Sequence, residues 1–374
     1  MIPLCSSALA LVANRPARAG GGFASGERYP GSARLAQGET AAYHSPLRSE
    51  KMEGVGTVGR RPSCEAAARD IAPEEVVLPI GEFDLEMTLE SGQCFRWRRV
   101  GEREYVGIIG RSVVHARHVP RGHGRAGALA VRAVGGSIPD RLEALIVHYF
   151  DLARDYPAIL RTLRRDQAFA RVAPRRAGIH ILRQDPFEVI ISFIVSANNH
   201  IPRIRRILDR LCARYGEKIW TPFGPMYSFP RPEVLAEARL GELRYECGLG
   251  YRDHYVRATA RAVAEDADFA RWATWPTSVL RRRLLALEGV GEKVAECILL
   301  FGFHRLEAFP VDVWIARAMR ALYFPDRMPR VREIQACAAE RFGAYAGIAQ
   351  QYLYAAFRSG GSRGRRPLPG GGVE

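Results

Sequence analysis

The sequence lacks the cysteine pattern of a metal centre or a disulfide framework. Its seven cysteines are an odd number, they are spread from Cys5 to Cys337, and none forms a C-x-x-C pair. This arrangement argues against a disulfide-stapled fold, a zinc finger and an iron–sulfur cluster. Free cysteines suit a reducing compartment, so we expect a protein that is not secreted.

Long apolar runs are also missing. No stretch reaches the ~18 apolar residues of a membrane-spanning helix, so we expect no membrane span and no membrane partner. The apolar segment 4–13 resembles the core of a signal peptide, but no lysine or arginine precedes it. The expected location is therefore the cytoplasm or nucleoid in a bacterium, and the nucleus or mitochondrion in a eukaryote.

Acidic residues are few relative to basic ones. Forty Asp and Glu stand against 55 Lys and Arg among 374 residues, which gives a net charge of +15. A basic excess of this size favours a polyanionic partner, with nucleic acid first and an anionic membrane surface second. An arginine-rich organism with positively charged protein surfaces would produce the same balance.

Composition and periodicity divide the chain into four parts. Residues 1–72 are rich in Gly, Ala, Ser and Arg without sustained periodicity, which predicts a disordered extension. We expect an N-terminal α+β domain over 73–165 and a helical domain over 166–358. The Gly/Arg/Pro-rich residues 359–374 predict a flexible tail.

Alternating apolar residues predict a small antiparallel sheet in the first of these domains. Apolar side chains recur with a period of two over residues 83–89, which is typical of a half-buried strand. After a turn at SGQ, a second strand is expected to begin at Cys94. Residues 105–110 and 112–119 continue the pattern as further strands.

From Pro139 the apolar period changes to that of helices. The run at 185–197 is apolar on nearly every face and predicts a buried helix, with Asp185 as N-cap and Pro186 in its first turn. The fold class is therefore α+β, a sheet domain followed by a two-part helical domain. Further helices are predicted near 201–215, 232–239, 253–265, 276–287, 292–303, 313–323, 330–342 and 346–357.

The stretch LEGVGEKVAEC, residues 287–297, predicts a tight turn between two helices. Gly289 and Gly291 allow positive φ and a close approach to another surface. The second helix begins near Glu292, so its free N–H groups can hold a phosphate oxygen of the DNA backbone. A plain packing hairpin with a glycine C-cap is the alternative interpretation.

Lys293 follows these glycines in the first turn of the second helix. The helix dipole there opposes the ammonium form, and a neutral amine can attack a carbon centre to form an imine. Asp312, 19 residues later, predicts the N-cap of the next helix. A fixed carboxylate can also stabilise a developing sugar cation. A simple phosphate contact for the lysine and a simple cap for the aspartate remain the alternatives.

Together, L-x-G-V-G-x-K and P-V-D at this separation resemble the helix–hairpin–helix superfamily of DNA glycosylases, and the lysine marks its bifunctional branch. Five separated motifs between about residues 76 and 358 resemble the 8-oxoguanine DNA glycosylase family in particular. They are SGQCFRW (91–97), LRQDPFEVIISFIVSANNHIPRI (182–204), GLGYRDHYV (248–256), GVGEKVAEC (289–297) and GIAQQYLY (347–354).

This resemblance implies a monomeric enzyme whose partner is double-stranded DNA containing oxidised guanine. It implies that Lys293 attacks the sugar C1′ and that the strand is then nicked through a Schiff base, while Asp312 supports the cationic transition state. No cofactor and no catalytic metal are implied. A structural monovalent cation on the hairpin carbonyls of Leu285, Leu287 and Val290 is a further expectation.

The resemblance also assigns the base pocket and the opposite strand. The Gly92 carbonyl would detect the N7–H donor of the oxidised base, Gln350 would contact the Watson–Crick edge, and Cys297 and Tyr354 would enclose the ring. On the DNA side the implied residues are Asn198, which fills the gap, Arg203 and Arg252, which bind cytosine, and Tyr251, which wedges the stack. Apart from the family, a helix C-cap and solvated surface arginines would explain the last group.

Other functions are weighed against the same sequence features. A non-catalytic hairpin module would explain the charge and the glycines, but not the pairing of Lys293 with Asp312. Endonuclease III-like and adenine glycosylases carry a four-cysteine cluster after the aspartate, whereas only Cys337 follows it here. Alkyl-purine glycosylases normally lack the lysine.

Overall fold

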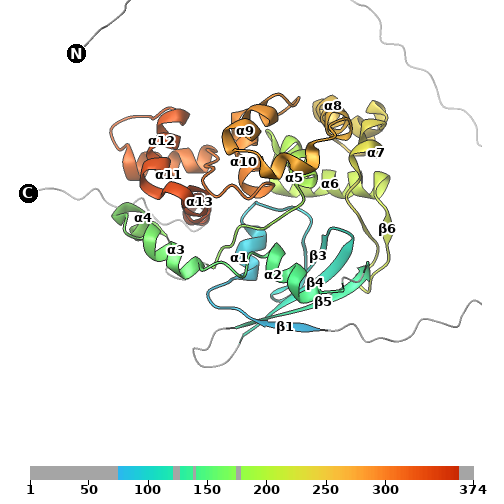
Figure 1. The fold of residues 1–374 in the computed structure, drawn as a ribbon, viewed down its shortest axis with the longest axis horizontal. Helices are drawn as coiled ribbons and strands as arrows, with labels where there is room; N and C mark the ends of the chain where they lie inside the picture. Colours follow the sequence, from blue (N-terminus) through green and yellow to red (C-terminus); the bar gives the residue numbers. More distant parts are fainter. Residues whose placement is uncertain (1–74, 121–126, 138–139, 174–177, 362–374) are drawn as a thin grey trace, which may run out of the picture. The chain divides into compact units, whose positions relative to one another are not determined.

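The computed structural model describes residues 75–120, 127–137, 140–173 and 178–361 (Figure 1). The extension predicted as disordered lies outside these residues, and so does the end of the predicted tail. The last helix, α13 (Ala346–Gly361), continues past the predicted boundary at residue 358. None of the helices in the described ranges is long and apolar enough to cross a membrane.

An antiparallel sheet of five strands forms the N-terminal part of the described chain. Its order is β1-β5-β4-β3-β2, so the first strand pairs with the last. β3 (Glu104–Ile109) pairs along its whole length with β4 (Ser112–Val119), which confirms the two strands predicted there. The other strands are β1 (Val76–Pro79), β5 (Ala128–Gly136) and β2 (Arg98–Gly101), which begins later than predicted.

The strand predicted over residues 83–89 is wrong, because Leu85–Glu90 form helix α1. Asp84 caps this helix: its Oδ1 accepts a hydrogen bond from Met87 N at 2.8 Å. The buried residues of α1 are three and four positions apart, so the same apolar side chains also satisfy helical spacing. The apolar residues of this short segment fit the strand period and the helical spacing equally well, and the N-cap at Asp84 favours the helix.

Trp97 connects the segment before β2 to the sheet and to helix α2 (Leu142–Tyr149). Gly107 in β3 provides the space, since a Cβ there would lie 2.3 Å from the indole ring. The indole Nε1 donates a hydrogen bond to Tyr149 Oη at 2.9 Å. This packing anchors the segment that carries Gly92.

Helix α5 (Pro186–Ser196) is buried on nearly all sides, as predicted from its uniformly apolar sequence. Its start is also confirmed: Asp185 Oδ1 accepts a hydrogen bond from Glu188 N at 2.8 Å, and Pro186 occupies the first turn. Helix α10 (Glu292–Phe301) packs against α5 and against α9 (Thr277–Leu285), while α11 (Val313–Tyr323) packs against α13. These contacts place the α9–α10 hairpin, α11 with Asp312 at its start, and α13 around the cavity described below.

Four of the six remaining helices in the described ranges lie close to the predicted ranges, whereas the first two and several short elements had no predicted range. The helices are α3 (Tyr156–Leu163), α4 (Gln167–Val172), α6 (Ile201–Tyr215), α7 (Pro232–Ala236), α8 (Asp253–Ala264) and α12 (Val331–Phe342). The unpredicted elements are a hairpin of β6 (Lys218–Ile219) and β7 (Met226–Tyr227), a π-helix η1 (Glu242–Glu246), and the 3-10 helices η2 (Gly250–Arg252), η3 (Phe269–Thr274) and η4 (Gly343–Tyr345).

Candidate active site

The two glycines of the α9–α10 hairpin have different physical roles. Gly289 has a φ of +79°, and a Cβ there would lie 2.8 Å from the Tyr255 side chain. Gly291 is the N-cap of α10 with a φ of −89°, and no atom of the described residues lies within 4 Å of a Cβ built on it. The fold therefore requires the first glycine, whereas the second leaves the backbone open at a helix N-terminus, where an anion can bind.

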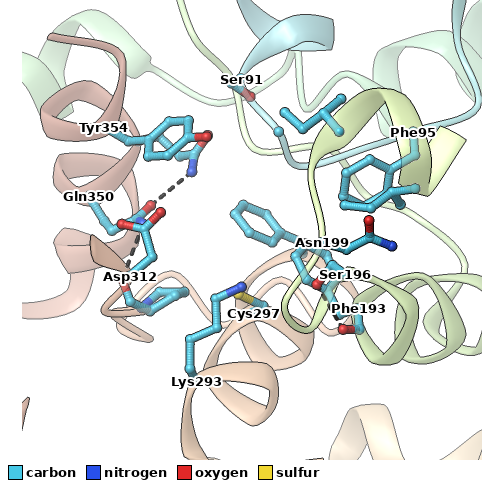
Figure 2. A pocket seen from close by; sticks show the side chains of 16 residues that line it. Ser91, Phe95, Phe193, Ser196, Asn199, Lys293, Cys297, Asp312, Gln350 and Tyr354 are labelled. Carbon is cyan, nitrogen blue, oxygen red and sulfur yellow. Dashed lines mark hydrogen bonds between the residues drawn. The ribbon is translucent and has the colours of Figure 1, made fainter. Parts of the chain in front are cut away.

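Lys293 lies in the first turn of α10, and its side chain is exposed. Its Nζ lies 5.6 Å from the centroid of the Phe193 ring, which belongs to α5. Figure 2 shows the side chain directed toward Cys297. Burial raises the pKa of the Cys297 thiol to about 11, and the charge of Lys293 opposes that rise. The amine therefore lies beside a neutral sulfur rather than a thiolate.

Asp312 is the N-cap of α11, as predicted, because its Oδ1 accepts a hydrogen bond from Ile315 N at 2.8 Å. The carboxylate is thereby fixed in orientation while it faces the cavity that Lys293 also faces (Figure 2). No ion pair joins the two side chains in the described residues, so their charged atoms lie more than 4.0 Å apart. The amine and the carboxylate are therefore two separate groups that line one cavity.

Glu296 was not predicted, yet it connects the two candidate catalytic residues. It lies one turn after Lys293 on α10 and is buried. Its Oε1 accepts a hydrogen bond from Arg281 Nε at 2.6 Å, and its Oε2 accepts one from Phe309 N at 3.1 Å. One carboxylate thus ties α9, α10 and the segment leading to Asp312. The signal in the sequence was a lone acidic residue inside the apolar run VAECILLF.

One cavity of about 150 Å³ brings together all the residues predicted for catalysis and base binding (Figure 2). Phe95, Phe193 and Phe301 add aromatic side chains to its wall. A recess with aromatic walls and a few polar groups suits a flat, polar ligand. The predicted residues that line it are Gly92, Lys293, Cys297, Asp312, Gln350 and Tyr354.

The backbone of Gly92 forms part of this wall. Its φ is +84°, and a Cβ there would lie 3.6 Å from Tyr354 Oη on the other side. The following residue, Gln93, fixes the turn: its Nε2 donates to His180 O and its Oε1 accepts from Leu182 N, both at 2.8 Å. The position of the glycine backbone is therefore set by the fold.

Cys297 and Tyr354 contribute a sulfur and an aromatic ring to the same cavity. Cys297 is buried on α10, and Tyr354 is half-buried on α13. The guanidinium carbon of Arg358 lies 5.6 Å from the centroid of the tyrosine ring. Burial raises the pKa of Tyr354, so its hydroxyl is protonated at neutral pH.

Gln350 is buried on α13 and is held by two hydrogen bonds. Its Nε2 donates to Pro310 O at 3.2 Å, and its Oε1 accepts from Gln351 Nε2 at 2.8 Å. Gln351, which was not predicted, also lines the cavity, and its Oε1 has no hydrogen-bond partner among the residues that the structure describes.

The residues predicted for the opposite strand lie outside this cavity. Asn198 follows α5 with a φ of +49°, a conformation that asparagine adopts more readily than most residues, and it is exposed. Arg203 at the start of α6 and Tyr251 in η2 are exposed as well. The structure thus places these three side chains on the surface.

Arg252 differs from the expectation that it would be free to bind cytosine, because it is only 3% exposed. Its guanidinium donates hydrogen bonds to the carbonyls of Ala197, Asn198 and Leu249. The guanidinium carbon also lies 4.3 Å from the centroid of the Tyr251 ring. These contacts engage most of the five N–H donors of an arginine. The side chain therefore holds the backbone of residues 197, 198 and 249 and is not free to bind a base.

Two protein-family models match the chain. Residues 75–190 match the N-terminal domain of 8-oxoguanine DNA glycosylase, and residues 191–343 match the HhH-GPD superfamily base excision DNA repair protein. The fold and the cavity therefore define a base-excision DNA repair protein of the helix–hairpin–helix class.

Individual relatives agree with this assignment. A probable N-glycosylase/DNA lyase from Methanothermobacter thermautotrophicus is 35% identical over 301 residues, which cover 74% of this chain and 94% of the relative. The N-glycosylase/DNA lyase of Saccharomyces cerevisiae is 34% identical over 264 residues, 65% of this chain and 69% of the relative.

A solved structure agrees as well. The 8-oxoguanine glycosylase/lyase of Clostridium acetobutylicum, in complex with double-stranded DNA containing cytosine opposite 8-oxoguanine, is 33% identical. Its TM-score is 0.68, and the match covers 75% of this chain and 93% of that one. This chain belongs to the 8-oxoguanine DNA glycosylase family.

Proposed function

We propose that this protein removes 8-oxoguanine paired with cytosine from double-stranded DNA and then cleaves the strand at the abasic site. The observation that carries this function is the placement of Lys293 and Asp312 in the cavity that Gly92, Cys297 and Gln350 also line. A module that only holds DNA has no use for an amine and a carboxylate facing one recess. The substrate of the clostridial relative supports the same assignment.

Lys293 is the nucleophile. Its neutral amine attacks C1′ of the deoxyribose, the C1′–N9 bond breaks, and the electron pair of that bond leaves with the purine. The side chain leaves the first turn of α10 and is exposed, so an extruded nucleotide can reach it and cover it. The attacking nitrogen loses a proton as the C1′–N bond forms, and the departing base gains a proton.

Asp312 stabilises the positive charge that develops on the sugar as the C1′–N9 bond lengthens. The N-cap hydrogen bond from Ile315 N holds the carboxylate in place, so it needs no reorganisation during the reaction. Glu296 holds the segment before Asp312 in place, because its carboxylate accepts hydrogen bonds from the backbone N of Phe309 and from Arg281.

Strand cleavage follows from the covalent intermediate. The sugar ring opens, and the bond between C1′ and the Lys293 nitrogen becomes a Schiff base. Loss of a proton from C2′ then expels the 3′ phosphate as the C3′–O bond breaks. Water hydrolyses the remaining imine and releases the lysine for another turnover.

The cavity distinguishes the oxidised base by hydrogen bonding and by shape. 8-Oxoguanine carries an N7–H donor where guanine carries an acceptor, and the Gly92 carbonyl accepts from that donor. Cys297 and Tyr354 enclose the two faces of the ring, and Gln350 contacts its Watson–Crick edge. Ordinary guanine would direct a lone pair at the carbonyl and is rejected.

The surface residues contact the rest of the duplex. Asn198 fills the gap left by the extruded base, Arg203 donates to the unpaired cytosine, and Tyr251 wedges the stack.

Backbone N–H groups at Gly289 and Gly291 hold a phosphate of the DNA backbone. A monovalent cation on the hairpin carbonyls stays a prediction. The expected place of action is the compartment that holds the genome, a nucleoid or a nucleus.

The test uses duplexes that contain 8-oxoguanine or guanine opposite cytosine. Wild-type protein should release free 8-oxoguanine and nick that strand only, whereas Lys293→Gln should do neither. Lys218→Gln is the matched control, because Lys218 lies over the Trp220 ring in the β6–β7 hairpin, away from the cavity. Folded wild-type protein that binds the duplex without releasing the base would contradict the proposal and favour a binding module.

A further inference from the structure

Helix α6 carries a row of arginines, of which the proposed function uses only the first. Arg203, Arg206, Arg210 and Arg214 follow one another at intervals of three, four and four residues. At about 100° per residue, their side chains lie within roughly 80° of one another on one face of the helix. All four are exposed. These four arginines form the α6 ridge.

Only the last arginine of the α6 ridge is neutralised. Arg214 Nη2 lies 2.9 Å from Glu242 Oε1, and Arg214 Nε lies 3.7 Å from Glu246 Oε2. None of the residues that the structure describes forms an ion pair with the other three arginines. Like charges three or four positions apart destabilise a helix, so an unpaired row of them favours a polyanion as its ligand.

The single acidic residue of α6 does not compensate the ridge. Asp209 points about 100° away from Arg210, and both line a cavity of about 320 Å³ together with Arg96 and Arg98. Arg96 is paired with Glu188, but Arg98, like Arg210, has no ion pair among the described residues. Two free guanidinium groups therefore face one carboxylate on that wall, and the excess charge is positive.

The α6 ridge lies beside the turn that carries Tyr251. A Cβ built on Gly248, three residues before Tyr251, would lie 3.5 Å from Arg210 Nη1. Arg214 reaches the π-helix η1, which precedes this turn, through Glu242. The ridge thus borders the segment 242–251, and it begins at Arg203. Its start and its flank are both residues to which we assign contacts with the cytosine-containing strand.

The length of the ridge suits a nucleic-acid backbone. An α-helix rises about 1.5 Å per residue, so Arg206 and Arg210 lie roughly 4.5 and 10.5 Å from Arg203 along the helix axis. One strand of a DNA duplex carries a phosphate about every 3.4 Å of its axis. The three free arginines therefore span the phosphates of roughly three nucleotides, and the guanidinium group matches the geometry of a phosphate.

We propose that Arg206 and Arg210 bind backbone phosphates of the strand that carries the cytosine. The DNA-binding surface then continues along α6 beyond the unpaired base. This inference rests on the proposed function, because Arg203 and Tyr251 place that strand at the start of the ridge. Phosphate contacts carry no sequence information, so the ridge strengthens binding to damaged and undamaged duplex alike.

The first test measures the affinity for an undamaged duplex by fluorescence anisotropy at several salt concentrations. The logarithm of the binding constant falls with the logarithm of the salt concentration, by about 0.9 per phosphate neutralised. The double variant Arg206→Gln/Arg210→Gln should therefore reduce this slope by about two, and it should bind at least about tenfold more weakly at ~0.1 M salt.

Arg214→Gln is the matched control, because Arg214 lies on the same face of the same helix but is already paired with Glu242. Its slope should stay within about 0.5 of the wild-type slope. A double variant with the wild-type slope would overturn the inference. A loss in Arg214→Gln as large as one half of the loss in the double variant would also overturn it, because the effect would then follow the charge of α6 in general.

The second test identifies the strand. In duplexes with 8-oxoguanine opposite cytosine, either strand is shortened from one end or the other, so that it stops about two nucleotides from the central pair. Shortening the cytosine strand on one side should reduce wild-type affinity more than it reduces the affinity of Arg206→Gln/Arg210→Gln. If only shortening of the lesion strand separates the two proteins, the strand assignment is wrong.

Failure of the proposed function has a different signature, since the salt test requires no chemistry. A protein whose double variant shows the reduced slope, but whose wild type excises no 8-oxoguanine, would keep the α6 ridge as a DNA contact and lose the proposed function. Normal excision together with an unchanged slope would remove only the role given to Arg206 and Arg210.

Discussion

The two groups of residues to which we assign contacts with DNA differ in how far the folded protein fixes their side chains. Around the cavity, Gly92 is positioned by the buried turn at Gln93, Asp312 by its helix cap and Gln350 by the Pro310 carbonyl. Beyond α5, the side chains of Asn198, Arg203 and Tyr251 are exposed.

This difference agrees with the functions that we propose for the two regions. Bond breaking requires reacting groups that are already in place, because small displacements cost large factors in rate. Recognition of an unpaired cytosine requires only side chains that can reach it, and surface arginine and asparagine can adjust. Arg252 links the regions, since it is buried like the first group but supports members of the second.

The largest expected effect follows from Asp312→Asn. Asparagine caps a helix as well as aspartate does, so the fold should be retained while the charge opposite the sugar is lost. Single-turnover base excision should fall about 10²–10³-fold, as for the loss of one charge-stabilising group. Affinity for the same duplex, measured by fluorescence anisotropy, should change little. Equal losses in rate and affinity would mean that Asp312 is only a cap.

The second prediction separates the two hairpin glycines. Gly289→Ala combines a positive φ with a clash against Tyr255, so it should lower the free energy of unfolding by about 2 kcal/mol. Gly291→Ala has space and an ordinary φ, so its cost should stay below ~1 kcal/mol while DNA affinity falls. Denaturant titration and anisotropy measure the two quantities. Identical behaviour of the variants would contradict the distinction.

The third prediction concerns the two arginines. Arg252→Met leaves the carbonyls of Ala197 and Asn198 without their donor and should lower the free energy of unfolding by ~1–3 kcal/mol. Arg203→Met should leave unfolding unchanged and reduce the preference for cytosine over adenine opposite the lesion by about tenfold. If Arg252→Met kept full stability and lost only that preference, the buried, supporting role assigned to Arg252 would be wrong.

The smallest effect is expected for Tyr354→Phe. The ring is retained and only the hydroxyl is lost, so excision should remain within about threefold of wild type, whereas Tyr354→Ala should lose about tenfold or more with the stacking surface. Single-turnover rates on 8-oxoguanine opposite cytosine provide the measurement. Equal losses in both variants would show that the hydroxyl matters more than the ring.

The sequence predicted those features whose causes are local. The starts of α5 and α11 follow from Asp185 and Asp312, whose side chains cap their own helices. The cavity residues were predicted through the family resemblance, and the structure brings them together. Even a local pattern fails where two periods fit, as at α1, where the cap at Asp84 decided against a strand.

Other features depend on contacts between distant segments, which no local pattern encodes. The burial of Arg252 requires the carbonyls of residues 197 and 198, more than fifty positions earlier. Glu296 acts through Arg281 and Phe309, and Arg210 lies beside Gly248 of another segment. Such residues can be assigned only once the tertiary structure places their partners.

The most direct test of the account is to trap the covalent intermediate and locate it. Borohydride reduction during the reaction with 8-oxoguanine opposite cytosine should yield a protein–DNA adduct, and peptide mapping should place it on Lys293. The sequence contains only two other lysines, Lys51 and Lys218, so the assignment is unambiguous. An adduct on another amine, or base release with no adduct at all, would contradict the central role of Lys293.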